Sequence, residues 1–348
     1  MQDNISVDPK TYLLYLIRKY KIRYFENFLS LGQNQGPQEF LVELLSCLST
    51  RYAINILPIF LPSYSHLINS GNYFKFWDFL KLKQQKFTFL RLDGIVIDSF
   101  FSNKKEFKIH FKKINNLIQR SDNLIFQSEF SQKAFTNISH LKKNSCVIKN
   151  GCSQINLFES DYKYLENLRR NLPLKYFVVA GRNIKRKRID QVINIFNKYN
   201  LGNLVVLSNF EKEKQFKNSR IYYMGLQEKN IARFIIKKAQ AIIHLDSYDW
   251  CPNIVSQAVF DRVPVICSNY GGTQEIVKNS GLIINEFKKD LEVNLENIKF
   301  AQNKKIEFEL VVDSLKKIKN NTDLEVRNDI SIDFCTSKYY EFIFKGRP

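Results

Sequence analysis

The chain has 348 residues, of which 44% are hydrophobic and 14% aromatic, with only 12 glycines and 8 prolines. A chain of this composition can bury sizeable cores, which excludes a largely disordered protein, and its length fits two domains of ordinary size. The net charge of +19 is compatible with binding to nucleic acid, an anionic membrane or anionic substrates, or with a Lys-rich composition throughout. Because no zinc-finger, helix-turn-helix or RNA-binding signature accompanies the basic residues, we expect no specific nucleic-acid recognition.

The six cysteines predict neither a disulfide framework nor a metal site. None has CxxC spacing, most lie in or beside apolar runs, and the four histidines form no HExxH pattern. We therefore expect reduced, buried thiols in a cytoplasmic protein. The polar start MQDNISVDPK is unlike a signal peptide, and no apolar run approaches the ~20 residues of a membrane-spanning helix.

In the first half of the chain, short β-rich runs alternate with helical patterns. We predict strands at residues 22–25, 53–60, 87–92, 124–127 and 146–148. Apolar residues at helical spacing predict helices at residues 38–48, 108–120 and 130–136. This alternation favours a mostly parallel sheet with helices on both faces. Residues 62–86 give the least readable pattern of the chain.

The second half repeats the alternation, with mostly continuous apolar strands that helices cover on both faces. We predict strands at residues 176–180, 203–207, 221–223, 241–245, 263–267 and 282–284, with helices at 189–198, 230–239, 252–260 and 273–278. The charged, strand-free stretch 160–174 predicts a domain boundary. Two doubly wound domains in tandem leave a cleft between the carboxyl ends of their sheets, where ligands bind. The tail from residue 302 is mostly helical in pattern, and 335–344 is apolar enough to dock.

Two candidate sites lie in the first half. The loop before the helix at 38–48 carries Gly36, whose backbone can approach a phosphate or sugar, although an ordinary turn explains it equally well. Arg91 and Asp93 end the strand at 87–92, where a charged pair faces the cleft of a doubly wound domain. The alternative for this pair is a surface salt bridge or an Asp-Gly turn.

The densest positive patch, GRNIKRKR, lies at residues 181–188 between a strand and a helix. Its guanidinium and ammonium groups can hold a pyrophosphate through charge-assisted hydrogen bonds, and Arg182 and Lys187 are the best candidates. The alternative is a solvated basic loop. Gly181, which stands just before Arg182, ends the preceding predicted strand.

The segment DWCPNIVSQAV at 249–259 joins a strand to a helix. Asp249 and Gln257 are about two helical turns apart and can address two ends of one ligand, although Asp249 also suits an N-cap. The N–H groups that follow Asn253, at Ile254 and Val255, can hold a phosphate. Downstream, Gly271-Gly272 allow a close backbone approach, and Glu275 suits the helix dipole at the first turn.

These segments together resemble the GT-B glycosyltransferases of the retaining family 4 type. GRNIKRKRID resembles that family's diphosphate-gripping segment, and DWCPNIVSQAVFDRVPVICSNYGGTQEIV resembles its donor-site signature. NLVVLSN and the run ending in AIIHLD resemble its middle strands, while RLDG, SDNLIFQSEFSQKAF and VIKNG resemble acceptor-domain segments. The shared order of the pieces makes the resemblance strong.

The resemblance implies an α/β protein of the GT-B class, with two doubly wound Rossmann-like domains facing across a cleft. It implies an acceptor-binding domain at 1–165, a donor-binding domain at 166–325 and a C-terminal helix at 326–348 that packs back on the first domain. The implied activity is retaining, metal-independent transfer from a UDP-, GDP- or ADP-sugar to a saccharide or lipid-linked acceptor. No cofactor is implied, and no DxD occurs in the matching stretch.

The resemblance also implies roles for individual residues. Arg182, Lys187 and Asp249 are the implied catalytic residues, and Arg91 and Asp93 lie on the acceptor side. The implied donor-binding residues are Gly36, Gly181, Asn253, Ile254, Val255, Gln257 and Gly272. At family level we expect polysaccharide or lipopolysaccharide assembly on the cytoplasmic membrane face, and +19 is compatible with peripheral contact with anionic lipid.

Two departures separate the chain from the family pattern. The family's E-x7-E motif reads Asp249 and Gln257 here, and loss of the second carboxylate costs on the order of 1.5–3 kcal/mol of donor binding. Many relatives have a histidine near the cleft where this chain has Arg91-Leu92-Asp93. The departures leave open a second function, that of a catalytically weak binding or scaffold subunit.

Overall fold

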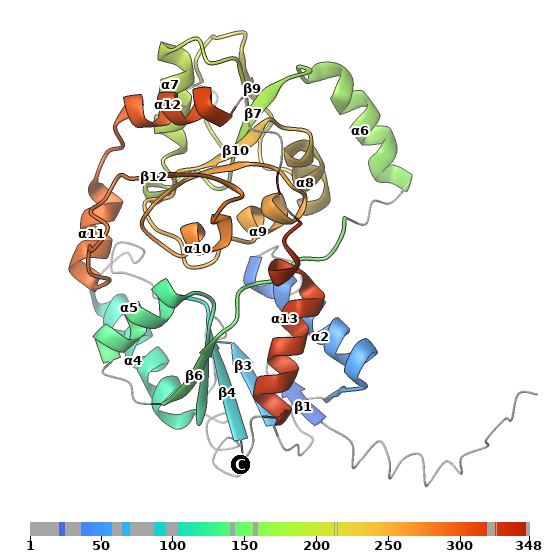
Figure 1. Cartoon of the computed structure of the whole chain (residues 1–348), viewed down its shortest axis with the longest axis vertical. Coiled ribbons are helices and arrows are strands. Elements are labelled where there is room, and N and C mark those ends of the chain that lie inside the picture. The colour runs from blue at the N-terminus through green and yellow to red at the C-terminus, as the bar shows by residue number, and fades with distance from the viewer. Residues whose placement is uncertain are drawn as a thin grey trace, which may run out of the picture. The chain divides into compact units, whose positions relative to one another are not determined.

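A computed structural model describes residues 21–24, 36–57, 65–69, 87–94, 104–139, 143–155, 159–211, 213, 215–318, 324 and 326–345 (Figure 1). The chain divides into two compact units. Unit 1 comprises the described parts of Met1–Phe126, Lys142–Ile148 and Ile332–Pro348. Unit 2 comprises those of Gln127–Leu141 and Lys149–Ser331. Each unit is built around its own parallel sheet.

The sheet of unit 1 has the order β2-β1-β3-β4-β5-β6, and every described pairing in it is parallel. Its strands are β1 (Lys21–Tyr24), β2 (Asn55–Leu57), β3 (Ser65–Asn69), β4 (Phe87–Leu92), β5 (Asn123–Phe126) and β6 (Asn144–Val147). Because paired strands run in the same direction, the chain must cross over the sheet to connect one strand to the next. Parallel neighbours require such crossovers, and helices lie in the described connections between β1 and β2, β4 and β5, and β5 and β6.

Helices α2 (Gly36–Tyr52) and α13 (Ile332–Tyr340) pack on the unit 1 sheet and on each other. Phe40 of α2 lies against Tyr339, and the rings of Tyr52 and Tyr340 stack 4.2 Å apart. Beyond α13, the π-helical turn η6 (Glu341–Lys345) adds Ile343 and Phe344 to the same core. The C-terminal helix is therefore part of the core of unit 1. The other helix among the described residues of this unit is α4 (Lys104–Arg120), which buries Ile114, Leu117 and Ile118.

The sheet of unit 2 has the order β12-β11-β10-β7-β8-β9, again with parallel pairings throughout its described strands. The strands are β7 (Tyr176–Ala180), β8 (Asn203–Leu207), β9 (Ile221–Tyr223), β10 (Ala241–His244), β11 (Val265–Ser268) and β12 (Gly281–Ile284). From β7 the chain first moves outward through β8 to β9, and then returns to β10 on the other side of β7. This reversal creates a topological switch point between β7 and β10.

Helices cover both faces of the unit 2 sheet. Alternate residues of β7 show this, because Val178 joins the core formed with α8, α9 and α10, whereas Phe177 and Val179 join the core formed with α7 and α12. Both cores are buried, which explains why the strands read as continuous apolar runs. The unit 2 helices are α5 (Glu129–Ser139), α6 (Glu159–Asn171), α7 (Ile189–Lys198), α8 (Lys229–Lys237), α9 (Asn253–Phe260), α10 (Thr273–Val277), α11 (Leu295–Asn303) and α12 (Phe308–Ile318).

The prediction of an α/β fold with parallel sheets is confirmed. Each predicted strand has a counterpart, although residues 25 and 58–60 of two predicted strands lie outside the described residues. The structure adds β3, which falls in the stretch 62–86 that gave no readable pattern. The charged stretch 160–174 is largely the helix α6. Among the described helices, none is both long and apolar enough to cross a bilayer.

Candidate functional site

The charged residues that the sequence predicts to bind a donor lie mostly at the carboxyl ends of β7 and β10. Gly181 directly follows β7, and the loop 245–252 directly follows β10. These two strands flank the switch point, and the loops after such strands diverge and leave space for a ligand. Strand order alone therefore places a candidate ligand site at the predicted segments 181–188 and 249–257.

Gly181 permits a close contact with Lys187. It has a φ of +130°, and a Cβ at this position would lie 3.1 Å from Cδ of Lys187. Lys187 ends the short 3-10 helix η3 (Lys185–Lys187), whose turn carries its side chain back over the glycine. The ammonium group lies 3.2 Å from Oδ2 of Asp246. Arg182, by contrast, is exposed.

Arg186 lies at the centre of the site. Its Nη1 donates to Oδ2 of Asp246 at 2.8 Å, to Oδ2 of Asp249 at 3.3 Å and to the carbonyl of Tyr248 at 3.1 Å. Its guanidinium also lies 5.6 Å from the centre of the Tyr248 ring. The backbone of the two loops is joined as well, because Ser247 N donates to the carbonyl of Arg186. Arg186 thus ties the loop after β10 to the loop after β7.

Asp249 is ionised by its surroundings. Burial by itself would raise the pKa of this carboxyl, but the positive charges of Arg186 and Lys187 lower the pKa well below its ordinary value. The buried Nε2 of His244 lies 3.7 Å from Oδ1 of Asp246 and 3.7 Å from Oδ2 of Asp249, too far for a hydrogen bond. About 13% of the Asp249 side chain is exposed, so the carboxylate can still reach a ligand.

Arg188 is the structural anchor of the basic loop. It is completely buried, and its Nη1 lies 2.8 Å from Oε2 of Glu286, which is buried as well. Its Nη2 donates to the carbonyls of Ala301 and Lys304. The backbone of Arg188 is left-handed, with a φ of 52°, at the junction of η3 and α7. An unfavourable backbone conformation in a non-glycine residue is maintained here by a buried guanidinium whose two Nη atoms bond Glu286 and backbone carbonyls.

The Gly271-Gly272 turn packs its backbone directly against the loop that carries Asp249. Gly272 N donates to the carbonyl of Asp249 at 2.6 Å. A Cβ on Gly272 would lie 2.0 Å from the carbonyl oxygen of Trp250, and one on Gly271, whose φ is +117°, would lie 2.8 Å from the amide nitrogen of Asp249. The two glycines are therefore required by this backbone contact, whatever they do for a ligand.

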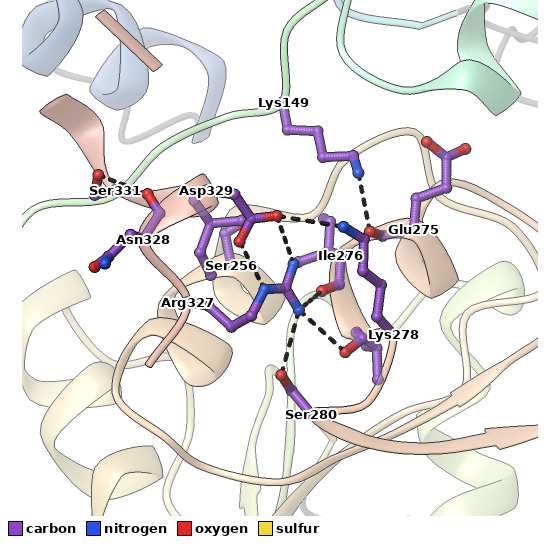
Figure 2. A network of polar contacts seen from close by, with 12 residues as sticks. Lys149, Ser256, Glu275, Ile276, Lys278, Ser280, Arg327, Asn328, Asp329 and Ser331 are labelled. Carbon is purple, nitrogen blue, oxygen red and sulfur yellow. Dashed lines mark hydrogen bonds and ion pairs between the residues drawn. The ribbon is translucent and has the colours of Figure 1, made fainter. Parts of the chain in front are cut away.

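A second network supports α10, the helix that follows the glycine turn (Figure 2). Arg327 forms a bidentate pair with Asp329 and donates to the carbonyls of Ile276 and Val277 at the end of α10. Lys149 donates to the carbonyl of Glu275. These contacts satisfy carbonyl groups that a short helix leaves unpaired at its C-terminus. They fix α10, and with it the glycine turn.

Glu275 serves a different helix from the one expected. The sequence predicted that it complements the dipole of its own helix, α10. In the structure its two carboxylate oxygens accept hydrogen bonds from the backbone N–H groups of Glu129 and Phe130, at 2.9 and 2.8 Å. Burial nonetheless raises the pKa of Glu275 above its ordinary value. The carboxylate therefore caps α5, a contact between residues 145 apart that sequence spacing does not reveal.

The N-terminus of α9 differs in part from its predicted use as a phosphate site. The amide groups of Val255 and Ser256 both donate to the carbonyl of Pro252, at 3.0 and 3.1 Å, and the Val255 side chain is fully buried. Asn253 accepts a hydrogen bond from Asn150 through its Oδ1. Of the predicted donor-binding residues at this helix start, Asn253 and Ile254 are partly exposed. Gln257 is nearly buried, with 8% of its surface exposed.

His244, Asp246 and Asp249 are the described side chains whose ligand atoms lie close enough to hold a metal ion, within 4.8 Å of one another. The same Oδ2 atoms of the two aspartates are already in contact with Arg186, and that of Asp246 also with Lys187. Two carboxylates paired with two cations leave no excess negative charge for a divalent ion. The chemistry of the group therefore fits a buried ion-pair network better than a metal site.

The predicted residues in unit 1 lie at the end of β4 and at the start of α2. Arg91 is completely buried, with its guanidinium 4.8 Å from the centre of the Phe40 ring and paired with Asp93. Burial leaves it no surface for contact with an acceptor, whereas 13% of the Asp93 side chain is exposed. Gly36 begins α2, and the loop that precedes it lies outside the described residues.

Three residues of the network were not singled out by the sequence: Arg186, His244 and Asp246. Arg186 lies in the basic run that was recognised, but a run of four cations does not show which of them faces the adjacent loop. Asp246 stands three residues before Asp249, and its only signal in the sequence is its place just past a predicted strand end. Such a position is a weak signal alone, because loops after strands are often polar.

Comparisons with known proteins identify the fold. The chain matches no protein-family model and no curated protein sequence. Among solved structures, HepE of Anabaena in complex with UDP-glucose matches 93% of this chain and 99% of its own, with a TM-score of 0.60 and 12% identity. A glycosyltransferase from Rickettsia africae matches 95% of this chain and 100% of its own, with a TM-score of 0.57 and 14% identity.

WaaG, a glycosyltransferase involved in lipopolysaccharide biosynthesis, gives a TM-score of 0.55 at 11% identity and covers 94% of this chain and 100% of its own. At such low identity these likenesses show the fold and nothing further. The chain has a GT-B fold, α/β with two Rossmann-like domains.

Proposed function

We propose that this protein is a retaining glycosyltransferase of the family 4 type that uses a nucleotide-sugar donor. The observation that carries the proposal is the group Arg186, Lys187 and Asp249 at the switch point of the unit 2 sheet, where cations and an ionised carboxylate stand together. A nucleotide sugar offers matching partners, namely a diphosphate for the cations and sugar hydroxyls for the carboxylate. In transfer, the bond from the anomeric carbon to the diphosphate oxygen breaks, a bond to an acceptor hydroxyl oxygen forms, and the hydroxyl proton leaves with the released nucleoside diphosphate or to solvent.

In this proposal the leaving diphosphate is stabilised by Arg182 and Lys187, because negative charge develops there as the sugar departs. Asp249 contacts the donor sugar and Gln257 the ribose. The backbone of Gly181, Gly272, Asn253, Ile254, Val255 and Gly36 lines the donor, while Arg91 and Asp93 belong to the acceptor side. The Val255 amide already donates to the carbonyl of Pro252, and the buried Arg91 acts on the acceptor side only through its ion pair with Asp93.

No metal takes part in the proposed reaction, since Arg186 and Lys187 already neutralise the carboxylates that would bind one. Two of the structural neighbours point to the substrates. HepE was crystallised with UDP and with UDP-glucose, and WaaG acts in lipopolysaccharide biosynthesis. These support a nucleotide-sugar donor, and we extend the proposal to UDP-, GDP- or ADP-sugars and to a saccharide or lipid-linked acceptor in cell-envelope polysaccharide assembly.

The test is a calorimetric titration with UDP-, GDP- and ADP-sugars, followed by a turnover assay with the donor that binds. We expect binding of one nucleotide class and slow release of its nucleoside diphosphate through hydrolysis. The proposal would be refuted if none of these donors binds. Binding without turnover, together with a co-purifying transferase, would support the alternative of a binding or scaffold subunit, which the Asp249 and Gln257 departures motivate.

The proposal includes peripheral contact with anionic lipid at the cytoplasmic membrane face, and α4 is the surface that supports it best. Its exposed face carries Lys105, Lys108, Lys112, Lys113 and Arg120, along with Ile109, which is 48% exposed. Cations around an exposed apolar side chain suit an anionic bilayer surface.

Reversing two of these charges in Lys108→Glu/Lys112→Glu should weaken binding to vesicles rich in phosphatidylglycerol by about tenfold or more, since each basic residue near such a surface contributes about 1 kcal/mol. Sedimentation with vesicles measures the effect. The matched control is Lys288→Glu/Lys289→Glu, which reverses two exposed lysines of unit 2 and should bind like the parent protein. Equal losses in the two variants would show that net charge, and not α4, governs the contact.

A further inference from the structure

Asp246 is a buried carboxylate that contacts both cations of the candidate donor site. Its Oδ2 lies 2.8 Å from Nη1 of Arg186 and 3.2 Å from Nζ of Lys187. Only 3% of its side chain is exposed. A carboxylate in this position is weakly screened by solvent and salt, so it acts on the charge of the site at full strength.

The charges of the basic loop show what Asp246 balances. Residues 182–188 hold five cations, and Arg188 is paired separately with Glu286. Asp246 and Asp249 together offset Arg186 and Lys187. Arg182 is exposed and makes no contact with a carboxylate among the described residues. Because both inner cations are offset, Arg186 and Lys187 add little net positive charge to the attraction of a diphosphate.

The two cations differ in how firmly they are held. Arg186 has Asp249, the carbonyl of Tyr248 and the Tyr248 ring as further partners, so it keeps its place without Asp246. Lys187 has an ion pair with Asp246 alone among the described residues, and its flexible stem lies over Gly181. Lys187 is therefore the cation that can exchange partners.

We propose that Asp246 is a positioning residue that holds Lys187 in place while the donor site is empty and competes with the donor diphosphate for its ammonium group. The inference rests on the proposed function, because it assumes that a diphosphate binds beside Lys187. When the diphosphate arrives, Lys187 moves from Asp246 to a phosphate oxygen, and Arg186 remains paired with both aspartates. Asp246 thereby reduces donor affinity, and it keeps the lysine oriented towards the position of the leaving group.

The test is calorimetric binding of inorganic pyrophosphate and of UDP, GDP and ADP to the full chain and to Asp246→Asn at low salt. The amide keeps the shape and one acceptor oxygen but removes the charge, so we expect roughly tenfold tighter binding of these ligands. The salt dependence of binding should become steeper, since more of the cation charge is then available to the ligand. An unchanged or weaker affinity in a folded variant would overturn the inference.

Two further variants separate positioning from general effects. In the Lys187→Met background, Asp246→Asn should tighten binding by about threefold or less, because the exchanging partner is gone. Asp290→Asn removes an exposed carboxylate of the same unit and should leave affinity unchanged. If Asp246→Asn does not fold, Asp246→Ser tests the same removal of charge. Absence of pyrophosphate and nucleotide binding in the parent protein would overturn the proposed function along with the inference, whereas parent binding without tightening overturns the inference alone.

Discussion

Replacing Lys187 with methionine should lower the turnover number for sugar transfer by about 10²- to 10³-fold, while the chain stays folded. The side chain lies at the carboxyl end of β7 over Gly181, and its ammonium group is the charge that can move to the leaving diphosphate. Loss of a single group that stabilises developing negative charge typically costs this much. Methionine keeps most of the apolar stem, so packing over the glycine is retained.

The matched control for this prediction is Lys185→Met. Lys185 belongs to the same turn, η3, but its side chain is exposed and donates to Asn303. Its removal should change turnover by less than about threefold, since surface contacts of this kind are worth little. Steady-state kinetics with the donor identified by calorimetry measure both variants. Turnover of Lys187→Met equal to that of the parent protein would refute the role assigned to this lysine.

Arg188→Met should lower the free energy of unfolding by about 3–5 kcal/mol. The substitution leaves Glu286 buried without its guanidinium partner, and a single charge stranded in a core costs about this much. The carbonyls of Ala301 and Lys304 also lose a donor. Urea unfolding followed by circular dichroism measures the loss.

A double variant shows whether charge or packing causes the loss. Arg188→Met/Glu286→Leu removes both charges and should recover a large part of the stability, because a buried ion pair can often be replaced by apolar side chains. Surface replacement of Lys198 by methionine, on the neighbouring helix α7, should change the free energy of unfolding by less than about 0.5 kcal/mol. If the double variant is as unstable as Arg188→Met, the anchor acts through hydrogen bonds to the carbonyls and not through its pairing with Glu286.

The fold could be predicted from the sequence because the signals for it are local. Continuous apolar runs such as YFVVA at β7 have the length and composition of strands buried on both faces, and the structure buries every residue of that strand. β3 was not predicted because its sequence, SHLIN, contains three polar residues. Its hydrogen-bonded pairing with β4, which the sequence does not show, makes it a strand. Strand order is also not local, so the switch point between β7 and β10 had to come from the structure.

The site could be predicted only in outline. The glycine turns and the basic run predict loops whose backbone comes close to another group. The structure shows such contacts at Gly181 and Gly272. Which charges pair depends on loops 60 residues apart, as for Arg186 with Asp246. Arg91 illustrates the opposite case. A charged residue at a strand end looks functional, yet here the core formed with α2 encloses it completely.

Hydrogen–deuterium exchange with a bound nucleoside diphosphate tests the placement of the donor site in unit 2 directly. The full chain is exchanged alone and with saturating UDP, GDP or ADP, whichever binds. We expect slower exchange in residues 181–188, 249–257 and 271–273, since backbone groups at these loops would close on the ligand. Unchanged exchange at these loops, with protection confined to residues 36–57 or 87–94 of unit 1, would contradict the placement of the donor site.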